Sequence, residues 1–148
     1  MNKYLQHDGL EKWSFIWSEV RLLVAAVALF LGGVPPLLYL FPTGDTIEPV
    51  VLALKIAWII SGLASAYLLY QWVGKRRLFG KKDTWDTTAF FVSVVSGFNL
   101  GITGIFGQNI GMSLVNNSTV FIVVGLIYVV TAVYLFRRWQ ASGNKLFS

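Results

Sequence analysis

The chain has no cysteine, one histidine and few charged residues, and each shortage excludes a class of protein. Without cysteine, neither a disulfide framework nor a thiolate metal site can form in these 148 residues. Charged residues make up 13% of the chain, whereas a soluble domain carries about 25%. A disordered chain is also excluded, because 55% of the residues are hydrophobic. These shortages indicate a protein that places most of its surface in a membrane.

Long uncharged runs predict the membrane-spanning helices. Three such runs cover residues 22–44, 56–74 and 87–136. A bilayer core about 30 Å thick is crossed by about 20 helical residues. The third run is long enough for two crossings, and the polar residues 116–118 divide it. We therefore predict an all-α fold, an integral membrane four-helix bundle of two helical hairpins, with spans at about 22–41, 49–72, 88–114 and 120–136.

The residues before the first expected span form a second unit. Leu10, Trp13 and Trp17 recur at helical spacing, and Asp8 with Glu11 three residues later resembles a capping box. We expect residues 1–20 to be a cytoplasmic arm containing an interfacial amphipathic helix, and residues 21–148 to be the transmembrane domain.

The basic residues predict the orientation of the chain. Every lysine and arginine except Lys55 lies in the N-terminal arm, the middle loop or the C-terminal tail. Four spans place these three segments on one side, so both termini are expected to be cytoplasmic, at a plasma or inner membrane. This arrangement explains the net charge of +5 without a nucleic acid partner. Anionic lipid is the expected counter-charge for the middle loop, at Lys75, Arg76, Arg77, Lys81 and Lys82.

The expected spans carry no catalytic signature. The one histidine, His7, precedes them, and none of them contains an aspartate or glutamate. A Ser-His couple, a metal cluster and a membrane carboxylate that exchanges protons therefore have no candidate residues. We expect no catalytic residue, no cofactor and no metal site.

Two sequence signals mark the third span. Asp83, Thr84 and Asp86 precede it, and such side chains cap the free N–H groups of a first turn. Within the span, residues spaced three or four apart form a stripe about 80° wide on one helix face, and they are Ser93, Gly97, Gly101, Gly104, Gln108 and Gly111. Small residues allow another helix to approach closely. We expect this packing stripe to meet the second span, or alternatively another subunit.

Lys55 is the one ionisable residue inside an expected span, about 9 Å below the outer boundary. One reading is that its side chain extends to the outer loop and contacts Asp45 or Glu48. The other gives it a functional role, because Pro36 in the first span frees nearby carbonyl groups. This hypothesis predicts a polar pocket open to the outside for a small anion or a polar headgroup, lined by Lys55, Gln108, Asn109, Gly32 and Gly33.

Asn99 lies on the face of the third span opposite the packing stripe. An asparagine facing lipid is costly, so we expect it to contact the fourth helix or another subunit.

Two functions remain open from the sequence. In the first, the protein acts through helix–helix association, as an accessory or scaffold subunit, as a homo-oligomer or within a larger membrane complex. In the second, it is a channel or transporter subunit that uses the outer polar pocket. Polar residues inside the expected spans are scarce, which favours the first function.

Overall fold

The computed structural model describes residues 7–32, 44–107, 117–144 and 146–147. The described chain forms four helices, α1 (His7–Phe30), α3 (Gly44–Lys75), α4 (Thr84–Phe106) and α6 (Ser118–Ala141). Within the described ranges the other regular feature is an isolated bridge between Leu78 and Lys81. The prediction of an all-α protein is confirmed.

Each of the four helices is long and apolar enough to cross a membrane. The qualifying segments are Gly9–Phe30, Glu48–Lys75, Thr84–Phe106 and Ser118–Ala141. Their lengths of 22 to 28 residues correspond to about 33–42 Å of helix, which exceeds the hydrocarbon thickness of a bilayer. By length and composition the chain is an integral membrane protein.

Local signals fix the ends of α4 and α6. The Asp83 side chain accepts hydrogen bonds from the backbone N–H groups of Trp85 and Asp86, and so caps α4. Asn117 caps α6 in the same way by accepting from the N–H of Thr119. Gly107 ends α4 with a positive φ of 73°, a conformation that glycine adopts without strain.

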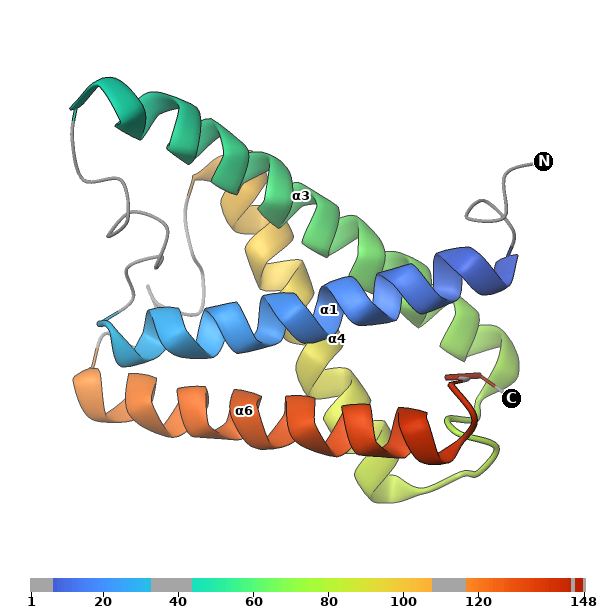
Figure 1. Cartoon of the computed structure of the whole chain (residues 1–148). Coiled ribbons are helices and arrows are strands. Elements are labelled where there is room, and N and C mark those ends of the chain that lie inside the picture. The colour runs from blue at the N-terminus through green and yellow to red at the C-terminus, as the bar shows by residue number, and fades with distance from the viewer. Residues whose placement is uncertain (1–6, 33–43, 108–116, 145, 148) are drawn as a thin grey trace.

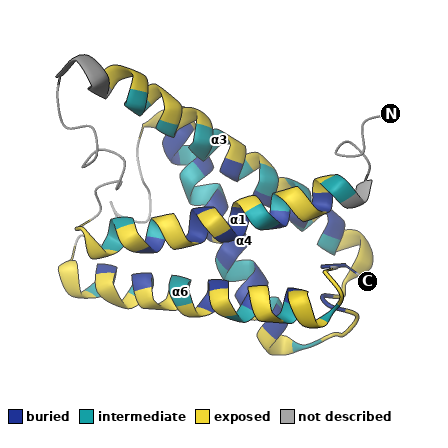
Figure 2. Cartoon of the chain, in the orientation of Figure 1, coloured by how far each residue is buried: buried dark blue, intermediate teal, exposed yellow. Residues whose placement is uncertain are grey.

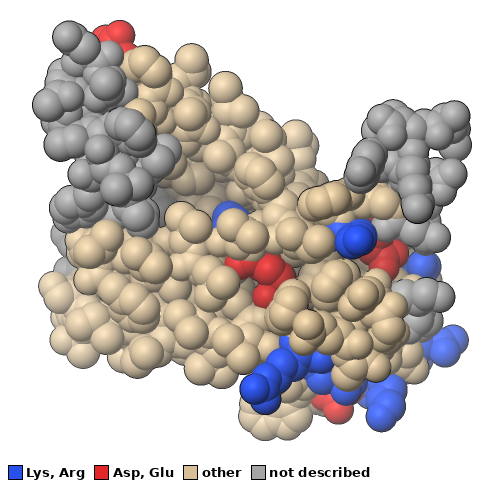
Figure 3. Space-filling view, viewed as in Figure 1, with Lys and Arg blue, Asp and Glu red and all other residues tan. Residues whose placement is uncertain are grey.

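The helices pack mainly in two pairs, α3 with α4 and α1 with α6 (Figure 1). Consecutive segments of the chain run in opposite directions, so the start of α1, the α3–α4 loop and the end of α6 lie at one end of the molecule (Figure 1). We call it the basic end, because most lysine and arginine atoms visible in the space-filling view gather there (Figure 3). Two hairpins were expected from the sequence, but α1 packs most extensively on α6 rather than on α3.

The hydrophobic core lies toward the basic end. It joins α1, α3, α4 and α6 with the α3–α4 loop and the C-terminal segment, residues 146–147. Apolar side chains farther along the helices are exposed on the outer faces, as Figure 2 shows for α1 and α6. In a membrane protein these exposed faces contact lipid. The core consists of Phe15, Leu68, Leu78, Phe79, Ala89, Phe90, Val94, Leu135, Trp139, Leu146 and Phe147.

The first helix differs from its sequence expectation. The segment expected as an interfacial helix and the first part of the expected span 22–41 form one continuous helix, α1, which ends at Phe30. Residues 33–41 of that span lie outside the described residues. This difference moves two charged residues, Glu19 and Arg21, from the expected membrane boundary to the middle of a candidate span.

Candidate functional site

Arg21 is buried where α1 meets α4. Its Nη1 donates a hydrogen bond to Ser96 Oγ at 2.8 Å, and its Nη2 donates to the carbonyl oxygen and the hydroxyl of Ser93 at 2.8 and 3.2 Å. The residue is 7% exposed. A guanidinium group is strongly hydrated in water, so its burial is tolerable only with such polar partners.

These contacts occur near the middle of the spans. Ser93 and Ser96 flank the centre of the segment Thr84–Phe106, and Glu19 is at the centre of Gly9–Phe30. The candidate span Gly9–Phe30 thus contains Glu19 and Arg21, whereas the sequence analysis expected Lys55 as the one ionisable residue inside a span and no acidic residue there. An ionisable group at this depth costs several kcal/mol unless it is paired.

Serines of α3 extend this polar region. Trp17 Nε1 donates to Ser61 Oγ at 2.9 Å, and Ser61 Oγ donates in turn to the carbonyl oxygen of Ala57. Ser65 follows one turn later and is fully buried against Gly97 of α4. Three helices thus contribute to one region, which we call the polar cluster, and its members are Trp17, Ser18, Arg21, Ser61, Ser65, Ser93 and Ser96.

Four buried atoms in and beside the polar cluster have no hydrogen-bond partner among the described residues. They are Ser18 Oγ, Glu19 Oε1, Arg21 Nε and Ser65 Oγ. An unpaired buried polar group costs about 1–3 kcal/mol, and native proteins contain few of them. Two hydroxyl groups and one guanidinium N–H of the polar cluster are therefore available for a polar species. The Glu19 carboxylate lies on the opposite face of α1 from Arg21.

The packing stripe lies against α3. A Cβ atom added at Gly101 would lie 2.9 Å from the Cα of Gly62, and one at Gly104 would lie 2.8 Å from the carbonyl oxygen of Lys55. A Cβ at Gly97 would collide with Ser65. Ser93, at the start of the stripe, bonds Arg21 instead. Gln108 and Gly111 lie outside the described residues. The described stripe is thus occupied within the monomer.

The expected outer pocket is described only in part. Gly33, Gln108 and Asn109 lie outside the described residues. The side chain of Lys55 is exposed, and Gly32 is exposed with a positive φ of 81°. Neither residue belongs to the polar cluster.

Asn99 and the basic loop residues have different surroundings. Asn99 is half-buried, and its carbonyl oxygen accepts a hydrogen bond from Thr103 Oγ1 at 2.8 Å.

All five basic residues expected to contact lipid are exposed. Two of them also make contacts within the chain, since Lys75 Nζ donates to the carbonyl oxygen of Phe147 and Arg76 lies over the ring of Trp72. The five basic residues of this loop are Lys75, Arg76, Arg77, Lys81 and Lys82.

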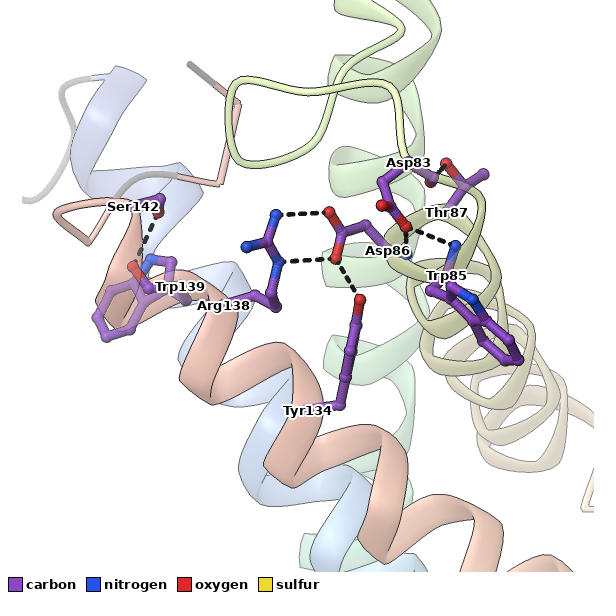
Figure 4. Close-up of polar contacts among 8 residues, drawn as sticks. All are labelled: Asp83, Trp85, Asp86, Thr87, Tyr134, Arg138, Trp139 and Ser142. Carbon is purple, nitrogen blue, oxygen red and sulfur yellow. Dashed lines mark hydrogen bonds and ion pairs between the residues drawn. The ribbon is translucent and has the colours of Figure 1, made fainter.

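A second polar constellation holds α4 to α6 at the basic end (Figure 4). Asp86 is fully buried and receives hydrogen bonds from Arg138 Nε, Arg138 Nη2 and the Tyr134 hydroxyl, at 2.9, 2.9 and 2.7 Å. Three hydrogen bonds thereby satisfy most of the roughly four lone-pair sites of the carboxylate. We assign this group a structural role, because the carboxylate is fully buried and paired within the chain.

The C-terminal segment closes the same end. Glu11 accepts hydrogen bonds from the backbone N–H groups of Leu146 and Phe147, both at 3.2 Å. Phe79 donates its N–H to the carbonyl oxygen of Leu146 at 2.8 Å. These contacts bring α1, the α3–α4 loop and the end of the chain together.

The sequence analysis missed the polar cluster because it started the first span at residue 22. A window that includes Glu19 and Arg21 still reaches the hydropathy of a membrane span, since an 18-residue window within Gly9–Phe30 averages 1.6. A first span placed farther toward the N-terminus would therefore have included these two residues. It would not have found their partners on α3 and α4, which depend on how the helices pack.

The described residues contain no group of three or more His, Cys, Asp or Glu side chains that could hold a metal ion. The chain was compared with protein-family models, with curated proteins and with solved structures, and no match was found.

Proposed function

We propose that this protein is a subunit of a membrane channel or transporter, in which the polar cluster contacts a small anion or polar solute during its passage. The observation that carries the proposal is Arg21, a guanidinium group buried at mid-span with its Nε unpaired. Ionisable residues at this depth commonly mark ion or solute pathways, because a purely structural position is better filled by an apolar side chain.

The chemistry of the polar cluster fits the proposed substrates. A guanidinium group offers five donors, and three hydrogen bonds to Ser93 and Ser96 leave some of them available. Buried hydroxyl groups of Ser18 and Ser65 can donate or accept. A small anion or a hydroxylated solute would satisfy these groups in place of water.

Helix association, the first function considered from the sequence, has lost part of its support. The packing stripe was its main contact face, and α3 covers the described part of that stripe. Association still enters the proposal, because four helices are few for an enclosed pathway. We therefore propose that other copies of the chain, or a partner membrane protein, complete the pathway.

Flux through liposomes tests the proposal. The purified protein is reconstituted in liposomes, and chloride, nitrate and glycerol serve as probes. Chloride entry is followed with an entrapped chloride-sensitive dye, and entry of nitrate or glycerol is followed by light scattering as the liposomes swell. We expect flux above that of empty liposomes. Arg21→Gln should reduce its initial rate about tenfold, the equivalent of one lost charge-assisted hydrogen bond.

Arg137→Gln is the matched control, because Arg137 is exposed on α6. It should leave the flux unchanged. Equal rates for protein-containing and empty liposomes with all three probes would overturn the proposal, and so would an Arg21→Gln variant that folds and transports like the wild type.

We also propose that both termini are cytoplasmic and that the exposed basic loop contacts anionic lipid. The absence of native cysteine makes labelling direct. In intact cells, a membrane-impermeant maleimide should label Ser118→Cys, at the start of α6, and not Gln140→Cys, at its end. The reverse pattern would overturn the orientation. Adding phosphatidylglycerol should raise the melting temperature of the wild type more than that of a Lys81→Gln, Lys82→Gln variant.

A further inference from the structure

Glu19 is a buried carboxylate, and one of its oxygens lacks a hydrogen-bond partner in the part of the chain that the structure describes. It is 7% exposed, and its Oε1 has no partner among the described residues. Glu19 and Arg21 are two positions apart, so their side chains leave α1 in directions about 160° apart and do not face each other. Arg21 is directed to α4 by Ser93 and Ser96. The described structure accordingly contains no salt bridge between the two residues.

The helices packed against α1 supply few other charges. Between Asp86 and Phe106, α4 has no titratable residue. The membrane part of α3 carries Lys55, which is exposed, as well as Tyr67 and Tyr70.

On α6 the titratable groups are Tyr128, Tyr134, Arg137 and Arg138. Tyr128 interacts electrostatically with Arg21, whereas Tyr134 and Arg138 bond Asp86. Arg137 is exposed. Arg21 is the charged group whose field acts on Glu19.

We propose that Glu19 is a proton-binding site, at which the carboxylate accepts a proton and later releases it during the transport cycle. This inference rests on the proposed function and names its coupling ion. The step is an acid–base equilibrium: the carboxylate and one proton form the carboxylic acid, no electrons are exchanged, and release regenerates the anion.

Two observations favour a proton over another cation. A metal ion requires several ligands, and no suitable group exists among the described residues. A proton needs no cavity and no second ligand, and it removes the charge whose burial is costly. Arg21 has a distinct role in the cycle, because its fixed positive charge stabilises the ionised form and so permits release.

Infrared spectroscopy of the full-length protein in phosphatidylcholine liposomes tests the inference directly. The chain has seven aspartates and glutamates, so the pH titration is read as the difference between the spectra of the wild type and Glu19→Gln. This difference should contain a carboxylic C=O stretching band that disappears as the pH rises, and Glu19→Asp should shift it. Glu48→Gln, which changes an exposed glutamate at the start of α3, should leave it unchanged. Identical carboxylic bands in the wild type and Glu19→Gln throughout the titration would overturn the inference.

Flux measurements separate this inference from the proposed function. If both hold, an inward pH gradient accelerates uptake of the chloride or glycerol probe, and Glu19→Gln removes the acceleration. Flux that does not depend on pH and is unchanged by Glu19→Gln would contradict proton coupling but still support transport. If the infrared band of Glu19 titrates but no probe enters the liposomes, the proton-binding site is supported and the transport function is contradicted. Melting temperatures establish that each variant folds.

Discussion

Arg138 donates two hydrogen bonds of 2.9 Å to Asp86, and this pair joins the last turns of α6 to the first turn of α4 (Figure 4). The carboxylate is fully buried, while the Arg138 side chain is 30% exposed. The Tyr134 hydroxyl donates a third hydrogen bond. The pair lies at the basic end, where the hydrophobic core also lies, so this end holds the bundle together.

Removing the arginine of this pair should destabilise the protein. We expect Arg138→Ala to lower the free energy of unfolding by about 3–5 kcal/mol, because Asp86 would remain buried with an uncompensated charge. Tyr134→Phe should cost about 1.5–3 kcal/mol, the value of one hydrogen bond to a charged group. Thermal unfolding in mild detergent measures both. Arg137→Ala, one residue away and exposed, should change stability little, and an equal loss from both arginine variants would refute the structural role of the pair.

Side chains larger than glycine in the packing stripe should destabilise the contact of α3 with α4. Gly101→Ala places a Cβ atom 2.9 Å from the backbone of Gly62, so the helices must separate. We expect a loss of about 1–3 kcal/mol, typical of overpacking. Gly74→Ala is the control, because a Cβ atom there meets nothing within 4 Å. That variant should be as stable as the wild type or up to about 1 kcal/mol more stable, since alanine favours helix.

The C-terminal segment should contribute to folding despite its position at the end of the chain. Phe147 is 5% exposed and packs edge-on against Phe90. Phe147→Ala should cost about 3–5 kcal/mol and should make the last residues sensitive to protease. Phe106→Ala, which changes a phenylalanine that is 72% exposed, should have little effect on detergent-solubilised protein. Protease resistance equal to that of the wild type would show that the segment is held by other contacts.

The cap of α4 offers a test of local signals. Asp83→Ala should cost about 1 kcal/mol, because two N–H groups of the first turn lose their acceptor. Asp83→Asn should retain most of the stability, since asparagine caps about as well as aspartate. Melting temperatures of the three proteins check the order, and a loss in Asp83→Asn as large as in Asp83→Ala would point to charge rather than capping.

The sequence predicted features that depend on local composition. Four apolar segments, the cap at Asp83 and the exposure of the basic loop all follow from residues close together in the chain. Boundaries were less accurate. The first span was expected to begin at residue 22, because Glu19 and Arg21 have the composition of a membrane surface. The structure continues the helix through them, since α4 supplies Ser93 and Ser96 as partners for the guanidinium group.

The sequence alone determined that this protein is helical and suited to a membrane, because an apolar run of about 20 residues can satisfy its backbone only as a helix in lipid. It also indicated which face of α4 could accept a close neighbour. Only the tertiary structure decided that α3 occupies that face and that Glu19 and Arg21 lie inside the bundle. The burial of a charged side chain depends on partners more than 70 residues away for Arg21, and no local pattern specifies such partners.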